Sequence, residues 1–364
     1  MSTPRWTPEQ LAVLEVSGVG LAVTAGAGAG KTTVLVEKCA RLLSARTDAR
    51  ICAVSFTERS ASDLRLKLSR FDLSRHWVTT IHGLCGLILR EFPEASGTQG
   101  DERILSEGQS VSLWNEAIEA LWFDSREESE KEVASLQRLL AQEGKQALVS
   151  LLSRMRDLNL AGGLNKARSS ADPYLHDLAL TAERVMKSYE SLKYAAGALD
   201  FSDLEKGALK AVQSEQVRQQ LQKRFDLILV DEFQDTNPAQ AEIIWALVRP
   251  DFSNLCVVGD PKQSIYRFRR ADILTYNKVR KIVEDVGGEV VPLTANFRSI
   301  KPVVDWVNGC FNEVFPAKSD DYSPANRPLD VGRPDGSEHK SAVEKLLAPA
   351  ALNRKDLIAE HEAD

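Results

Sequence analysis

A turn rich in glycine and alanine near the N-terminus ends in a lysine and a threonine. It reads Ala25-Gly26-Ala27-Gly28-Ala29-Gly30-Lys31-Thr32, and it lies between the apolar run Leu21–Ala25 and a helical pattern. Small residues let backbone N–H groups curl around a polyphosphate, and the N-terminus of a helix adds partial positive charge. Lys31 would reach the β- and γ-phosphates, and the Thr32 hydroxyl would bind Mg²⁺. The turn therefore predicts a nucleotide-binding loop, although the usual pattern starts with glycine where Ala25 stands.

Two carboxylates follow a second apolar run. Leu227–Val230 is typical of a strand that is buried on both faces, and Asp231 and Glu232 come directly after it. Ligands bind at the carboxyl ends of such strands. Asp231 would hold Mg²⁺, and Glu232 would orient and deprotonate the water that attacks a phosphate. Together with the loop, this pair predicts Mg²⁺-assisted hydrolysis of a phosphoanhydride in a bound nucleotide.

Composition sets limits on the class of protein. With 364 residues, the chain is longer than one compact domain usually is, and an apolar fraction of 43% excludes disorder throughout. Neither a long apolar run nor a signal-peptide pattern is present, so we expect no membrane span and no secretion. Five cysteines without CxxC spacing predict buried thiols in a reducing cytoplasm. A net charge of −6 disfavours nonspecific coating of nucleic acid but permits local basic patches.

Apolar runs alternate with helical patterns along much of the chain. The expected strands are 21–25, 51–57, 77–82, 226–232, 254–260 and 289–297, and helices are expected over 32–43, 60–68 and 238–248. This alternation predicts an α/β fold with a doubly wound parallel sheet. The strand signal disappears between about 96 and 200, where 111–122, 136–152 and 175–194 have helical spacing. We expect an all-helical insertion there, and no strand after Pro328.

Several further motifs carry a resemblance to a known family. Asp231–Asp235, Gly259–Arg269 and Leu293–Ser299 resemble the UvrD/Rep-like branch of superfamily 1 helicases, a group that includes AddA- and RecB-type enzymes. Thr7–Gln10 resembles the family's adenine-reading motif. The segments 55–61, 79–83 and 199–204 resemble two strand-contacting motifs and the short element after the helical insertion. With the loop, eight motifs follow the family's order over roughly residues 6–310.

The resemblance implies a RecA-like P-loop domain, formed by residues 1–95 and 201–275, with the helical insertion at 96–200. Residues 276–330 would begin a second, incomplete RecA-like domain, and 331–364 would be a linker or truncated tail. After Ser299 we find neither the family's glycine-containing DNA-contact motif nor its arginine finger. We therefore expect a C-terminally truncated form that binds nucleotide, hydrolyses it slowly and does not unwind DNA alone.

The resemblance also implies roles at the nucleotide. Gln10 would hydrogen-bond adenine and Phe297 would stack on it. Gln263 would sense the γ-phosphate, and Arg298 would contact it from across an interdomain cleft. These two residues would join Lys31, Asp231 and Glu232 in catalysis. The nucleotide would be bound by Gln10, Ala25, Gly26, Ala27, Gly28, Ala29, Gly30, Lys31, Thr32, Thr33 and Phe297.

A DNA strand would be bound by aromatic and polar side chains from three motifs. Phe56, Tyr266 and Phe268 would stack on bases, which tolerates any sequence. The expected backbone contacts are Thr57, Arg59, Thr80, His82 and Arg269, and His82 could equally be a structural histidine at a strand end. Glu58 departs from the family pattern and is a poor neighbour for phosphate.

The sequence thus predicts an ATP-dependent 3′→5′ DNA helicase or translocase of repair or recombination, cytoplasmic and nucleoid-associated. Its substrate would be single-stranded DNA or a duplex with a 3′ single-stranded tail, and a nuclease or repair subunit would be a partner. One alternative is a nucleotide- or DNA-binding module or subunit without motor activity. A P-loop switch or kinase is a third candidate, and the aromatic residues Phe56, Tyr266 and Phe268 disfavour it.

Overall fold

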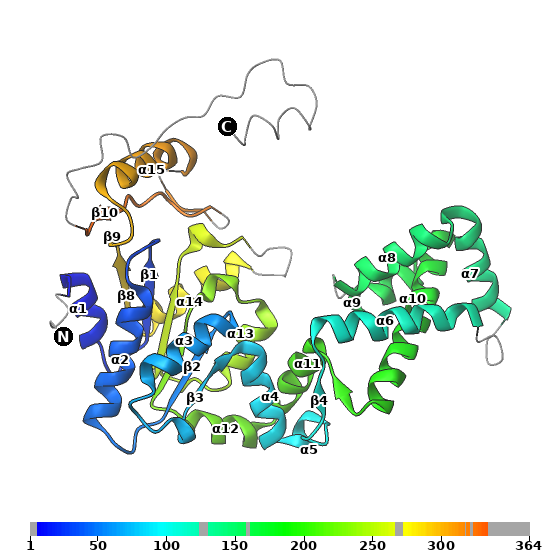
Figure 1. Ribbon diagram of the computed structural model, residues 1–364, viewed down its shortest axis with the longest axis horizontal. Helices are drawn as coiled ribbons and strands as arrows, with labels where there is room; N and C mark the ends of the chain where they lie inside the picture. The colour runs from blue at the N-terminus through cyan, green and yellow to red at the C-terminus, as the bar shows by residue number, and fades with distance from the viewer. Residues whose placement is uncertain are drawn as a thin grey trace, which may run out of the picture.

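A six-stranded parallel sheet forms the centre of the protein in the computed structural model, which describes residues 6–123, 130–157, 161–265, 272–316, 318–320 and 323–333. The strands lie in the order β3-β2-β6-β7-β1-β8 (Figure 1). They are β1 (Leu21–Ala25), β2 (Ile51–Ser55), β3 (Trp77–Thr80), β6 (Leu227–Val230), β7 (Leu255–Gly259) and β8 (Glu289–Leu293). Because all pairings are parallel, the carboxyl ends meet at one edge. The predicted α/β fold is confirmed.

Helices cover both faces of the sheet, so both faces are apolar. On one face lie α1 (Pro8–Glu15), α2 (Lys31–Ala45) and α3 (Glu58–Leu68). The other face is covered by α4 (Ile81–Glu91), α11 (Phe201–Val212), α12 (Glu215–Arg224), α13 (Pro238–Trp245) and α14 (Ile273–Asp285). Successive residues of each strand alternate between the two apolar cores. In β6, for example, Leu229 packs with the α2 face and Ile228 with the α11 face.

Five helices within residues 107–195 pack around a core of their own. They are α6 (Glu107–Phe123), α7 (Glu130–Glu143), α8 (Lys145–Asp157), α9 (Ala161–Arg168) and α10 (Pro173–Ala195), and Figure 1 shows them grouped beside the sheet. Their core includes Trp114, Leu148 and Tyr189. The helical pattern at 136–152 is divided into α7 and α8 because Gly144 has a positive φ of 77°.

Two predictions about strands were wrong. The insertion is not all-helical, since β4 (Arg103–Ile104) pairs with β5 (Ala198–Leu199) after the short helix α5 (Pro93–Ser96). A strand also follows Pro328, because β10 (Asp330–Val331) pairs with β9 (Ala295–Asn296). In both pairs each strand is two residues long, which is too short to produce a recognisable alternation of apolar and polar residues in the sequence. Between β9 and β10 lies α15 (Lys301–Val314).

Two strand ends also fall earlier than predicted, because helices begin there. Thr57 and Thr80 have extended backbones, and their hydroxyls accept hydrogen bonds from Ser60 N and Gly83 N, which makes them the N-caps of α3 and α4. The described residues also contain three short 3₁₀ turns, η1 (Leu73–Arg75), η2 (Phe233–Asp235) and η3 (Pro261–Gln263). Cys39, Cys52, Cys85 and Cys256 are buried thiols as predicted, but Cys310 is exposed. In the described ranges, none of the helices has the length and apolarity that crossing a bilayer requires.

Candidate nucleotide-binding and strand-binding site

The predicted phosphate loop connects the end of β1 to the start of α2. Gly28 and Gly30 have φ values of 72° and 75°, in the left-handed region that side chains disfavour. Space is restricted as well, because a Cβ on Gly28 would lie 2.8 Å from Asn296 Nδ2. Gly30 is the N-cap of α2, so the first backbone N–H groups of that helix are directed toward the loop. This arrangement fits an anion.

The segment after β8 holds the loop from the other side. Asn296 Nδ2 donates to the Ala27 carbonyl at 2.7 Å, and Phe297 N donates to the Gly28 carbonyl at 2.9 Å. Phe297 is exposed beside the loop, as adenine stacking would require. Asn296 was not among the predicted site residues. Its place beside Phe297 in a recognised motif was the available signal, but the contact depends on β1 and β8 being neighbours.

Gln10 reaches the loop from α1. Its side-chain Oε1 accepts from Thr7 N at 3.1 Å to complete a capping box, and its Nε2 donates to the Ala29 carbonyl at 3.2 Å. The structure therefore brings together two residues predicted to contact adenine, Gln10 and Phe297, which both lie beside Gly30. Arg298 follows Phe297 and is exposed, with its Cβ close to Gly28. Thr32 and Thr33 lie in the first turn of α2.

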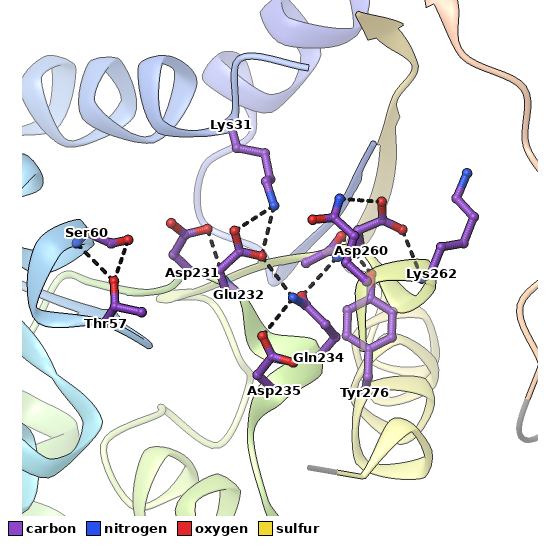
Figure 2. A network of polar contacts seen from close by, with 12 residues as sticks. Lys31, Thr57, Ser60, Asp231, Glu232, Gln234, Asp235, Asp260, Lys262 and Tyr276 are labelled. Atoms are coloured by element: carbon purple, nitrogen blue, oxygen red, sulfur yellow. Dashed lines mark hydrogen bonds and ion pairs between the residues drawn. The ribbon is translucent and has the colours of Figure 1, made fainter. Parts of the chain in front are cut away.

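Lys31 and the two carboxylates meet at the same edge of the sheet. Figure 2 shows the Lys31 side chain pointing toward Glu232, with Asp231 beside it. Lys31 Nζ lies 2.8 Å from Glu232 Oε1 and 2.9 Å from Oε2. A shared site for a triphosphate and a cation requires this proximity.

The Asp231 carboxylate is buried, and among the described residues its hydrogen-bond partner is the backbone N–H of Glu232, at 3.0 Å. Burial raises the pKa of Asp231 to about 6, the charge of Glu232 adds to that, and Lys31 opposes it. A buried carboxylate with one hydrogen bond and a raised pKa is stabilised by a cation. Asp231 and the Thr32 hydroxyl are oxygen donors of the kind that Mg²⁺ prefers. The residues present therefore fit the ion.

Glu232 has a strained backbone and a constrained side chain. Its φ of 53° and ψ of 43° lie in the left-handed region, which costs a non-glycine residue about 1 kcal/mol or more. Gln234, fully buried, donates through Nε2 to Glu232 Oε2 at 2.9 Å and to Asp235 at 3.1 Å. Burial, followed by the charge of Glu232, raises the pKa of Asp235 to about 6. Gln234 and Asp235 were quoted in the motif but had no predicted role.

The same glutamine connects the acidic motif to the segment after β7. Gln234 Oε1 accepts from Asp260 N at 3.0 Å, and Gly259 leaves room for this contact because a Cβ there would lie 2.7 Å from Gln234 Oε1. Gln263, predicted to sense the γ-phosphate, donates through Nε2 to Asp260 Oδ2 at 2.8 Å. Figure 2 shows how this chain of polar contacts runs from Lys31 to Lys262 along the sheet edge.

Several residues predicted to contact a DNA strand lie at the carboxyl ends of the neighbouring β-strands β2 and β3. Phe56 follows β2 and is partly buried, Thr57 and Arg59 are exposed, and Thr80 ends β3. Since Thr57 and Thr80 cap α3 and α4, two helix N-termini stand side by side at this edge and favour phosphate. Glu58 does not project freely: its Oε1 accepts from Thr80 at 3.1 Å, and Arg65 lies 3.7 Å from its Oε2.

The His82 ring is engaged with α11. Its Nε2 lies 3.3 Å from Glu205 Oε1, and the ring lies 4.6 Å from that of Phe201. Burial raises the pKa of Glu205, but hydrogen bonds from His82 and Gln240 outweigh it and leave the pKa lowered. The histidine remains partly exposed, so both of its expected roles are compatible with this position. Tyr266, Phe268 and Arg269, the other predicted strand contacts, lie outside the described residues.

A phosphate loop after β1 and acidic residues after β6, on one parallel sheet, define a RecA-like nucleotide-binding domain. The chain belongs to the UvrD/REP helicase N-terminal domain family, which it matches over residues 6–284. It is 31% identical over 321 residues to the ATP-dependent DNA helicase UvrD1 of Mycobacterium leprae, and 27% identical over 307 residues to the ATP-dependent DNA helicase PcrA of Staphylococcus epidermidis. These matches cover 83% and 82% of this chain, but 38% and 39% of the relatives' length.

Proposed function

We propose that this chain binds ATP with Mg²⁺ and a single DNA strand, as part of an ATP-dependent DNA helicase or translocase. The observation that supports this most directly is the contact of Lys31 with Glu232, beside Asp231, on the sheet edge that also carries the predicted strand contacts. One bound triphosphate could thus be contacted by a phosphate-binding lysine, a cation held by Asp231 and a general base. The relatives named as ATP-dependent DNA helicases support the same reading.

In this proposal each side chain has one task. Lys31 and the N–H groups of the loop bind the phosphates, Asp231 and Thr32 hold the Mg²⁺ that neutralises them, and Glu232 accepts the proton of the attacking water. Gln10 and Phe297 bind adenine, while Gln263 and Arg298 contact the γ-phosphate. The strand lies across Phe56 and the N-termini of α3 and α4, with Arg59, Thr80 and His82 contacting its backbone.

The sheet order supports coupling between the two sites. β2, which leads to Phe56, lies next to β6, which leads to Asp231 and Glu232. A displacement at one strand end is therefore transmitted to the other through a single pair of strands. We propose movement in the 3′→5′ direction, a role in DNA repair or recombination, a nuclease or repair subunit as partner and a nucleoid-associated location. The domain division at residues 95, 200, 275 and 330 belongs to the same proposal.

One observation favours a second candidate, a nucleotide- and DNA-binding module without motor activity. Both Glu232 oxygens accept hydrogen bonds from Lys31, and Oε2 also accepts one from Gln234. A carboxylate held in this way cannot deprotonate water until the lysine moves to the phosphates.

An ATPase assay with and without oligo(dT) separates the two candidates. Turnover stimulated by DNA supports the motor, whereas binding of both ligands without turnover supports the module. Indifference to DNA would contradict both candidates. Displacement of streptavidin from a biotinylated 5′ end, but not from a 3′ end, is expected of a 3′→5′ translocase.

A further inference from the structure

Gln234 is a buried glutamine whose side chain meets three acidic residues at the nucleotide site. It is 1% exposed and belongs to η2, two residues after Glu232. Its Nε2 donates to Glu232 Oε2 at 2.9 Å and to Asp235 Oδ2 at 3.1 Å, while its Oε1 accepts from Asp260 N at 3.0 Å. Figure 2 shows the side chain between these three acids. The proposed function gives it no task.

These partners set the orientation of the Gln234 amide. A side-chain amide has two N–H donors and one oxygen acceptor. Both N–H groups are directed at carboxylates and the oxygen at a backbone N–H, so the reversed amide would place oxygen against oxygen and donor against donor. An apolar side chain of equal length would fill the same space but break all three hydrogen bonds.

Gly259, the last residue of β7, leaves the room that this amide occupies. A Cβ there would lie 2.7 Å from Gln234 Oε1 and 2.9 Å from Tyr276 Cε2, distances that real Cβ atoms do not reach. Gly259 is not among the residues with a positive φ, so its backbone does not call for glycine. The close approach of the neighbouring side chains does.

The hydrogen bonds to Glu232 are divided unevenly between its two oxygens. Oε1 accepts from Lys31 at 2.8 Å, whereas Oε2 accepts both from Lys31, at 2.9 Å, and from Gln234. When Lys31 turns to the phosphates, Oε2 keeps the bond from Gln234, and Oε1 loses its partner among the described residues. A carboxylate that is held by one oxygen can accept a proton at the other. The two oxygens are therefore not equivalent.

We propose that Gln234 is a positioning residue for hydrolysis: it holds Glu232 by Oε2 and leaves Oε1 to take the proton of the attacking water. The inference rests on the proposed function, in which Glu232 is the general base. In that step a water O–H bond breaks as the water oxygen bonds to the γ-phosphorus. The bond from this phosphorus to the β–γ bridging oxygen breaks, and ADP leaves with the electron pair.

The strained backbone of Glu232 agrees with this role. Its left-handed conformation turns the chain into η2, and the side chain two residues later returns to its carboxylate. Strained residues persist where surrounding contacts over-determine them. Gln234 is such a contact, because it is itself held from the segment after β7. Asp260 N bonds to its side chain, and Ser264 Oγ donates to its backbone carbonyl at 3.2 Å.

Single-turnover hydrolysis, with the full chain in excess over labelled ATP, tests the proposal in wild type, Gln234→Met, Glu232→Gln and the double variant. Methionine keeps the length of glutamine and removes its hydrogen bonds. We expect Gln234→Met to hydrolyse ATP at least about tenfold more slowly, because small displacements of a reacting group cost large factors in rate. Its affinity for a fluorescent ATP analogue should stay at the wild-type value, since the lysine and the loop are unchanged.

The double variant separates positioning from a merely structural role. If Gln234 acts through Glu232, then Gln234→Met should not slow the residual hydrolysis of Glu232→Gln any further. Losses that multiply in the double variant would overturn the inference, because Gln234 would then act on hydrolysis by another route.

Asn254→Leu is the matched control for loss of a buried amide. Asn254 is also 1% exposed, and its Nδ2 donates to the Phe225 carbonyl while its Oδ1 accepts from Arg249 N, both at 3.0 Å. It precedes β7, so it lies at the opposite edge of the sheet from Gln234. Asn254→Leu should melt lower than wild type and hydrolyse ATP at the wild-type rate below its melting transition. An equal loss of hydrolysis in this control would overturn the positioning role.

Gly259→Ala displaces the amide without removing it, and it takes the place of Gln234→Met if that variant does not fold. We expect the same loss of hydrolysis with nucleotide binding retained. Wild-type hydrolysis in Gln234→Met, combined with loss in Glu232→Gln, would overturn the role of Gln234 alone. Absence of hydrolysis in wild type, or an undiminished rate in Glu232→Gln, would overturn the general base itself and this inference with it.

Discussion

Lys31 Nζ contacts both carboxylate oxygens of Glu232, at 2.8 and 2.9 Å, although the two residues are 201 positions apart in the chain. The lysine that we propose to bind phosphate and the proposed general base thus neutralise each other in this structure. Both side chains are largely shielded, so their attraction is stronger than that of a surface pair. A bound triphosphate would compete for the lysine and release the glutamate for its role as base.

Glu232→Gln should separate binding from hydrolysis. The amide keeps the shape of the side chain, but it removes the base and weakens the hold on Lys31. We expect turnover to fall about 100-fold or more, while affinity for the ATP analogue is unchanged or higher. Fluorescent-nucleotide titration and phosphate release measure the two effects. Lys31→Ala is the comparison, and it should lose binding; hydrolysis at wild-type rate in Glu232→Gln would refute the assignment.

Asp231 predicts a pH dependence of stability. Its pKa, raised to about 6 from an ordinary 3.8, means that the folded protein binds this proton more tightly than the unfolded chain does. Stability from this group is therefore present below about pH 4 and is lost as pH rises through about 6. The loss is at most about 3 kcal/mol.

Asp231→Asn removes this penalty. In the absence of metal, the variant should melt higher than wild type at pH 8, with the difference shrinking toward pH 5. Thermal melts across this range measure it, and Asp63→Asn, at an exposed ion pair, should show no such trend. A difference that grows as the pH falls would have the wrong sign for a raised pKa.

Phe56→Ala should weaken strand binding without affecting the nucleotide. Loss of one base–aromatic stack costs roughly 1–3 kcal/mol, or about 5- to 150-fold in affinity. Fluorescence anisotropy with oligo(dT) measures the effect. Tyr194→Ala removes another exposed aromatic, on α10, and should bind as wild type does. Equal affinity of the Phe56 and Tyr194 variants would remove Phe56 from the strand site.

Gln10→Ala should reduce discrimination between bases. A hydrogen bond to the Ala29 carbonyl holds the Gln10 amide at the phosphate loop. From this position the amide can hydrogen-bond the edge of adenine. We expect a lower ratio of ATP to GTP affinity, measured by competition. Gln109→Ala is a close control, since Gln109 forms the same reciprocal bonds with Ser106 at the start of α6. An unchanged ratio in Gln10→Ala would contradict adenine reading.

Lys193 should be important for stability at the junction of α10 and α11. Its side chain is 3% exposed, and its Nζ lies 3.2 Å from Asp200 and 2.5 Å from Asp203. Burial lowers the pKa of Lys193, but these carboxylates raise it more, so the lysine stays charged. Lys193→Met removes the buried cation that Asp200 and Asp203 share and should cost about 3–5 kcal/mol.

Urea unfolding measures this cost. Lys281→Met, at the exposed pair with Asp285, should change stability by less than about 1 kcal/mol. A similarly small effect at Lys193 would show that the two carboxylates find other partners.

Much of this protein follows from its sequence, where the signal is local. The small-residue turn between a strand and a helix predicted the phosphate loop, and the apolar run before Asp231 predicted a buried strand, because both depend on neighbours in the chain. The parallel sheet with helices on both faces follows from their alternation and is confirmed. Two strands predicted to end at Thr57 and His82 end at Ser55 and Thr80, since a residue that caps a helix can continue an apolar strand pattern.

Only the tertiary structure decided which strand ends are neighbours. Gln234 could be recognised in the sequence as part of a motif, but its hydrogen bonds to Glu232 and Asp260 depend on β6 lying next to β7. Pairings between strands so far apart are set by packing across the whole sheet, and no local pattern records that information.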